Sequence, residues 1–198
     1  MVDLRAGGAA HVTAPRPSRG AILAVALLLN QFVVALAGSS VATVGPGFRT
    51  AMGVSATALP WAVIVYVLAL GVLLLPFRWL CGRIGPFLVL LGGLWMFVQS
   101  SVVIGTHLVT TPHGFLALRG VQGAGAAALT AVALMLMPVR VRPAWSAVIL
   151  GGLGVGLLLG SAVPGDSWRW VFWANVPLAV LSGMTTLGLL RGARRRPA

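Results

Sequence analysis

Six long stretches without a charged side chain dominate the sequence, and each is bounded by Arg or Asp. They contain between 20 and 35 residues, and about 20 apolar residues are enough for a helix to cross the hydrocarbon layer. A backbone in lipid must satisfy its own hydrogen bonds, so each stretch is predicted to be a helix. A transmembrane barrel is excluded because the stretches are apolar throughout and do not alternate. We expect membrane spans near residues 21–44, 57–79, 86–106, 115–138, 144–165 and 170–190.

The composition excludes a water-soluble enzyme. Only 8% of the residues are charged and the mean hydropathy is +1.00, whereas about a quarter of the residues in a soluble domain are charged. The only carboxylates are Asp3 and Asp166, so a catalytic acid–base pair is excluded. His107 and His113 fall in one predicted loop, but two histidines without a third ligand are weak evidence for a metal site. The sequence therefore predicts no enzyme, no cofactor and no metal.

The fourteen arginines set the expected orientation of the spans. With a cytoplasmic N-terminus, only Arg49 and Arg169 fall in outer segments and Arg119 lies within a span. The other eleven face the cytoplasm, which is the positive-inside pattern. We therefore expect a multi-pass protein of a bacterial plasma membrane with both termini cytoplasmic. The arginines would lie near membrane lipids, so the net charge of +12 needs no nucleic acid.

The predicted spans divide the chain into three segments. Residues 1–19 are rich in Gly, Ala, Pro, Arg and Ser and are predicted to be disordered and cytoplasmic. Residues 20–190 form the six-helix transmembrane bundle, and residues 191–198 form a basic cytoplasmic tail.

Arg119 is the most unusual residue of the chain. A charge within a span is costly and marks a functional site by default, although a long side chain near the outer surface can also extend to water. Gln122 lies on the same face at i+3, and small residues follow from Gly123, which allows another helix to pack closely. We favour an Arg119 that faces the interior of the bundle.

Small and polar residues mark further contacts between helices. Gly152, Gly156 and Gly160 recur at a spacing of four in the fifth span, so they share one face and favour close packing. Uncharged polar side chains such as Gln31 and Tyr66 lie in the first two spans. Such side chains either form hydrogen bonds between helices or line a polar path.

Four stretches in four different spans carry a family pattern. They are residues 31–36 followed by Pro46, residues 59–66 with a W-x4-Y spacing, residues 118–127 with an R-x-x-Q-G-x-G-A-A motif, and residues 167–177, which begin S-W-R-W. In order and spacing they resemble the N-terminal half of major facilitator superfamily transporters. The pattern is similar to that of the fourteen-helix drug:proton antiporter branch.

The resemblance implies a fold and a set of site residues. The chain would be an all-α membrane protein whose six transmembrane helices form one half of a major-facilitator-type bundle, and the two halves would rock around a central path. Arg119 and Gln122 would line the substrate or proton path, and we place Gln31 and Tyr66 on it as well. The loop after the second span would be a gating motif, of which Arg83 and Gly85 match the family pattern.

The chain also departs from the family pattern. The family's acidic residue in the first span is Ala37 here, and its loop acid is Gly82. No span contains a carboxylate, although a proton-coupled carrier needs a group that titrates within the membrane.

Three functions remain open from the sequence. The first is export of small hydrophobic or cationic compounds by a half-length carrier, acting as a homodimer or beside a separately encoded second half. The second is a non-transporting membrane protein, either a decayed fragment or a packing or regulatory subunit. The third, a membrane enzyme that uses His107, His113 and Arg119, ranks last because it lacks an acidic ligand.

Overall fold

Seven helices and two short 3-10 turns make up the described part of the chain. The computed structural model describes residues 18–44, 46–55, 59–164 and 167–194, and no strand occurs within these ranges. The elements are α1 (Arg19–Ser40), η1 (Val41–Thr43), α2 (Pro46–Met52), α3 (Leu59–Ile84), α4 (Pro86–Gly105), α5 (Pro112–Leu136), η3 (Val139–Val141), α6 (Arg142–Ala162) and α7 (Trp170–Arg194). The segment 1–19 predicted to be disordered falls outside the described residues except for Ser18 and Arg19. Residues 195–198 of the predicted tail fall outside them too.

Six of these helices are long and apolar enough to cross a membrane. Within the described ranges they are α1 with η1, α3, α4, α5, α6 and α7, and their mean hydropathy lies between 1.3 and 2.3. The predicted all-α membrane fold with six spans is confirmed. The seven-residue α2 is not a span; it lies between the first two spans and was not expected.

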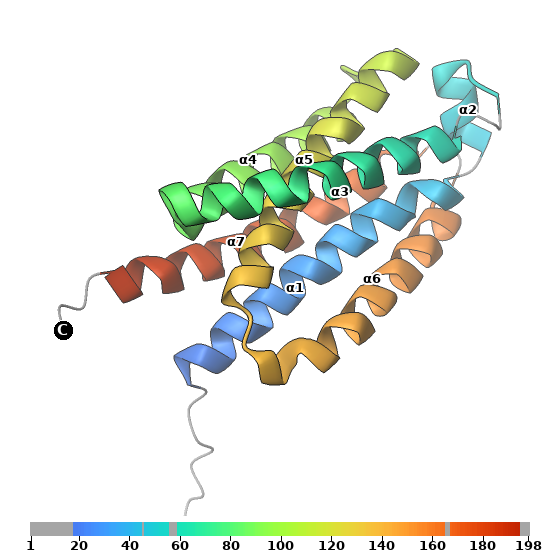
Figure 1. Cartoon of the computed structure of the whole chain (residues 1–198). Helices are drawn as coiled ribbons and strands as arrows, with labels where there is room; N and C mark the ends of the chain where they lie inside the picture. Colours follow the sequence, from blue (N-terminus) through green and yellow to red (C-terminus); the bar gives the residue numbers. More distant parts are fainter. Residues whose placement is uncertain (1–17, 45, 56–58, 165–166, 195–198) are drawn as a thin grey trace, which may run out of the picture.

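Successive spans run in opposite directions, as the colours of Figure 1 show. The start of α1 and the end of α7 therefore lie at one end of the bundle, and α2 lies at the other. Exposed arginines collect at the end shared by the two termini: Arg19, Arg78, Arg83, Arg140 and Arg191. This is the asymmetry that the positive-inside pattern requires, whichever side of the membrane that end faces.

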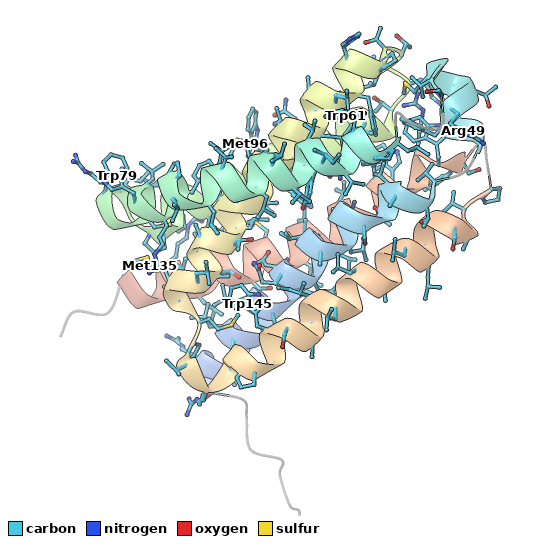
Figure 2. All side chains as sticks on the ribbon, turned by 45° about the vertical axis from the view of Figure 1, so that its right-hand side comes forward. Arg49, Trp61, Trp79, Met96, Met135 and Trp145 are labelled. Carbon is cyan, nitrogen blue, oxygen red and sulfur yellow. The ribbon has the colours of Figure 1, made fainter. Side chains whose placement is uncertain are left out.

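Two exposed tryptophans mark the expected membrane boundaries on α3. Trp61 and Trp79 are 57% and 61% exposed, and Figure 2 shows Trp79 pointing outward at one end of the helix. Their 18-residue separation corresponds to about 27 Å along a helix, close to the thickness of the hydrocarbon layer of about 30 Å. Tryptophan is enriched at both interfaces of a bilayer, so α3 has the length and the anchors of a spanning helix.

The helices pack in a fixed order around α5 and α1. α5 packs between α3 and α4, α7 packs on α4 and α1, and α6 packs along α1 (Figure 1). In an apolar 18-residue stretch of each helix, 61% of the residues are buried in α5 and 56% in α1, but only 11% in α3 and 17% in α6. α3 and α6 are therefore the two open edges of the bundle: each packs on one side, against α5 and α1 respectively, and exposes much of its apolar surface.

Glycines allow the closest helix contacts. A Cβ added at Gly152 or Gly156 would lie 2.6 Å from a carbonyl oxygen of α1, and one at Gly160 would overlap the carbonyl oxygen of Ser40. Gly123 packs in the same way against the main chain of α3 at Tyr66. In lipid, where apolar side chains gain little by leaving the solvent, such close contact is a main source of helix association.

An aromatic cluster closes the end of the bundle near α2. Phe48 of α2, Phe115 of α5, Trp168 just before α7 and Phe172 of α7 form this cluster, with ring centroids 4.8 to 6.2 Å apart in the contacting pairs. Most pairs are edge-to-face, the arrangement that aromatic quadrupoles favour. The cluster fixes α2 and the start of α7 against the ends of the spanning helices.

Candidate functional site

Arg119 lies inside the described bundle, in the part of α5 nearer α2, and is fully buried. Its Nε donates to the carbonyl oxygen of Ala62 at 3.2 Å, and its Nη1 donates to that of Ala37 at 3.2 Å and to Oε1 of Gln122 at 2.5 Å. The guanidinium carbon lies 4.4 Å from the centre of the Tyr66 ring. The side chain thus joins α5 to α1 and α3, and it does not extend to the outer surface.

Gln122 extends this network to a fourth helix. Its amide Nε2 donates to Oγ of Ser101 at 2.7 Å, and the Ser101 hydroxyl donates to the carbonyl oxygen of Phe97 at 2.7 Å. Gln122 and Ser101 are both fully buried. The Gln122 amide accepts from Arg119 with its oxygen and donates to Ser101 with its nitrogen. Both neighbours therefore set the orientation of the amide.

The charge of Arg119 has no acidic partner among the described residues. Ala37, at the position of the family's acid, offers its main-chain oxygen to Arg119 instead. Nη2 of Arg119 has no hydrogen-bond partner within the described chain. The bundle therefore carries an uncompensated positive charge, which only dipoles of carbonyls and the Tyr66 ring stabilise.

A cleft of about 340 Å³ opens on the face between the edge helices α3 and α6. Residues of α1, α3, α5 and α6 line it, and most of them are apolar. Gln31, Tyr66, Ser39 and Thr130 are its polar lining residues, and Trp145 of α6 contributes an aromatic wall. Pockets of this size and character hold small organic molecules.

The sequence-predicted path residues fall into two adjoining groups. Gln31 and Tyr66 line the cleft, whereas Arg119 and Gln122 lie behind it and do not line it. Tyr66 is the link, because one part of its ring faces the cleft and the guanidinium of Arg119 lies over it. Its hydroxyl donates to the carbonyl oxygen of Val34 at 2.8 Å, which fixes the ring between the two groups.

The proposed gating residues lie at the opposite end from α2. Gly85 is the single residue between α3 and α4 and has a φ of +89°, a conformation that favours glycine. Arg83 is exposed and places its guanidinium 4.6 Å from the centre of the Trp79 ring. Gly82 is exposed as well. Within the described chain these residues form a tight turn rather than a network of charged groups.

Two polar groups were not singled out as sites from the sequence. Asn30 of α1 accepts from the Ser182 hydroxyl at 2.8 Å and donates to the Thr186 hydroxyl at 3.3 Å, both on α7. Arg169 donates to the carbonyl oxygens of Ile104, Thr106 and Val109, just beyond and at the end of α4. A cation at the negative end of a helix is favourable, and partial burial lowers the pKa of Arg169 from its ordinary value.

The six-helix fold, the buried cation and the apolar cleft together define a polytopic membrane protein with a potential ligand path at its open face. The family model of the Major Facilitator Superfamily matches residues 27–198. The chain therefore belongs to this superfamily. The resemblance seen in the sequence is confirmed.

Curated relatives with similar sequences include antibiotic export and resistance proteins. A cephamycin export protein of Amycolatopsis lactamdurans is 32% identical over 195 residues, which cover 92% of this chain and 40% of the relative. A methylenomycin A resistance protein of Streptomyces coelicolor is 28% identical over 99% of this chain and 44% of its own length. A puromycin resistance protein of Streptomyces alboniger is 30% identical over 80% of this chain and 33% of its own length. The chain thus spans less than half the length of these relatives.

Proposed function

We propose that the chain forms one half of an exporter of small molecules, with the cleft between α3 and α6 as its half of the substrate path. The observation that carries this proposal is the cleft. It is of ligand size and mostly apolar, and α1, α3 and α5 each contribute at least one polar side chain to its lining. The export and resistance functions of the relatives support it. The substrate crosses unchanged, so the proposed function includes no catalytic reaction.

A second six-helix unit would complete the path. The apolar faces of α3 and α6 flank the cleft, and few residues in their spans are buried within the chain. A partner that contacts both edges would close the cleft against lipid, whereas lipid alone would fill it. The partner is either a second copy of this chain or a separate half, and carriers of this architecture bind substrate at such an interface between repeats.

We also propose that the arginine-rich end is cytoplasmic in a bacterial plasma membrane. The exposed arginines at the end shared by the termini support this orientation, and anionic lipid headgroups would attract them. No span of the chain contains a carboxylate. A proton-coupled cycle would therefore use a titratable group of the partner unit.

Efflux from a susceptible bacterial host tests the proposal. The chain is expressed alone and together with the genes that neighbour its own, and the accumulation of the uncharged dye Nile red and of cationic ethidium is measured. Ala42→Trp would fill the cleft, because Ala42 lines it. Ala147→Trp is the matched control, because Ala147 is exposed on α6 and does not line the cleft.

We expect Ala42→Trp to reduce efflux of at least one dye by about tenfold and Ala147→Trp to leave it unchanged. Efflux that is equal in both variants would show that the cleft is not the path. If neither dye is exported under any of these conditions, the exporter proposal fails.

The alternative is a non-transporting subunit, which the altered gating turn and the missing carboxylates favour. Cross-linking in the native membrane distinguishes the two, because a subunit would be recovered with a stable partner and would not change dye accumulation.

A further inference from the structure

The polar lining of the cleft offers a ligand one free donor and no negative charge. Gln31 is only 2% exposed and lines the cleft, and its Oε1 accepts from the Thr130 hydroxyl at 3.2 Å. With the amide in this orientation, the nitrogen is the free atom. Nε2 of Gln31 has no hydrogen-bond partner among the described residues. An unpaired buried donor is unfavourable, and a ligand that accepts from it removes that penalty.

The hydroxyl donors of the cleft are already engaged. The Tyr66 hydroxyl donates to the Val34 carbonyl oxygen at 2.8 Å, and the Ser39 hydroxyl donates to that of Leu153 at 2.9 Å. The Thr130 hydroxyl donates to Gln31. Each of these hydroxyls uses its one hydrogen within the chain, so Gln31 Nε2 is the donor that remains for a ligand in the described cleft, and the atom it binds must be an acceptor.

The charges around the cleft disfavour a charged ligand of either sign. No carboxylate lies in any span, and the uncompensated guanidinium of Arg119 lies directly behind the Tyr66 ring, so a cation would be desolvated and repelled. An anion would also lose its hydration, because Tyr66 separates it from Arg119 and the one unpaired side-chain donor of the described cleft lining is the amide of Gln31. Burial of a charge without pairing is costly.

Resting on the proposed function above, we propose that the cleft selects small, uncharged apolar compounds that carry a hydrogen-bond acceptor, such as an aromatic ketone, and rejects cations. The acceptor binds Nε2 of Gln31, and the apolar body packs against Tyr66, Trp145 and the aliphatic lining. This narrows the sequence-based expectation of hydrophobic or cationic substrates to the uncharged class.

Three brominated probes test this selectivity on the purified full chain in lipid nanodiscs. 4-Bromoacetophenone is uncharged and has a carbonyl acceptor, 4-bromoethylbenzene has the same carbon skeleton without the acceptor, and 4-bromophenyltrimethylammonium is a cation. Bromine quenches tryptophan fluorescence on contact. Trp145 lines the cleft, so the quenching that Trp145→Phe removes reports on probe at the cleft. The quenching that Trp61→Phe removes reports on probe dissolved in the lipid, because Trp61 is exposed and does not line the cleft.

We expect the ketone to bind about three- to tenfold more tightly than the ethyl analogue, which is the effect of one amide hydrogen bond. The cation should bind at least about tenfold more weakly than the ketone. A cation that binds as tightly as the ketone, or an ethyl analogue that does, overturns the inference. This ranking is measured on the unsubstituted chain and does not depend on whether a variant folds.

Gln31→Met assigns the preference to the amide. It should bring the ketone and the ethyl analogue within about twofold of each other, whereas Gln99→Met, at an exposed position of α4 outside the cleft, should leave the preference unchanged. A ketone preference that survives Gln31→Met overturns the inference. Selective binding without efflux would refute the proposed export function alone, and efflux without ketone selectivity would refute this inference alone.

Discussion

The hydrogen bond between Arg119 and Gln122 should produce a large coupling energy. Arg119→Met leaves Oε1 of Gln122 buried without its donor, and Gln122→Leu leaves Nη1 of Arg119 with the Ala37 carbonyl alone. Hydrogen bonds to charged groups contribute about 1.5–3 kcal/mol, and a buried group left unpaired costs a similar amount. The double variant has neither unpaired group. Its loss of unfolding free energy should therefore be about 1.5–3 kcal/mol smaller than the sum of the two single losses.

SDS-driven unfolding in mixed micelles, followed by tryptophan fluorescence, measures this cycle. The control cycle combines Gln122→Leu with Ser182→Ala, because Ser182 donates to Asn30 and shares no hydrogen-bond partner with Gln122. The control losses should add within about 0.5 kcal/mol. If the Arg119 and Gln122 losses also add within that range, the described network does not stabilise the fold.

Three further perturbations test other parts of the structure. Gly156→Leu should lower the unfolding free energy by about 1–3 kcal/mol, because the new side chain would meet the Leu36 carbonyl of α1. Gly154→Leu is the matched control, because the space around Gly154 is open. Equal midpoints of the two variants in an SDS titration would contradict the packing of α6 on α1. Arg169→Met should speed amide hydrogen exchange at residues 104–109 by about tenfold or more, because three carbonyl contacts are lost, and unchanged exchange would rule out this role. Cys81, the single cysteine, is 1% exposed and should react with a maleimide at least about tenfold more slowly in the folded protein than in SDS; equal rates would place the thiol at the surface.

The spacing of charged residues predicted the spans because a charge in lipid is costly, so all the arginines except Arg119 fall outside the apolar stretches. The helix ends were predicted less well. The second span was expected to end at residue 79, but α3 continues to Ile84. An exposed arginine marks the membrane boundary, and a helix can continue past that boundary into water. The fourth begins at Pro112 because the Thr111 side chain caps it, accepting from the Gly114 amide at 3.2 Å.

The site was less accessible to sequence reasoning. The i+3 spacing placed Arg119 and Gln122 on one face, and the structure joins their side chains. The other partners of Arg119 are main-chain carbonyl oxygens of two helices distant in the sequence. Every residue has such a carbonyl, so the sequence does not indicate which ones accept. The free donor of Gln31 likewise depends on Thr130, 99 positions later in the chain. Both features follow from the packing order of the helices, which hydrophobicity alone does not determine.

The choice of main-chain acceptors for Arg119 affects how the protein can diverge. A carbonyl oxygen is present whichever amino acid a codon specifies, so mutations of Ala37 or Ala62 to glycine or serine would preserve both attachments of the guanidinium. A carboxylate counterion, in contrast, would be lost through a single nucleotide change. The side chains that line the cleft can therefore change to fit new ligands while main-chain oxygens continue to bind the guanidinium of Arg119.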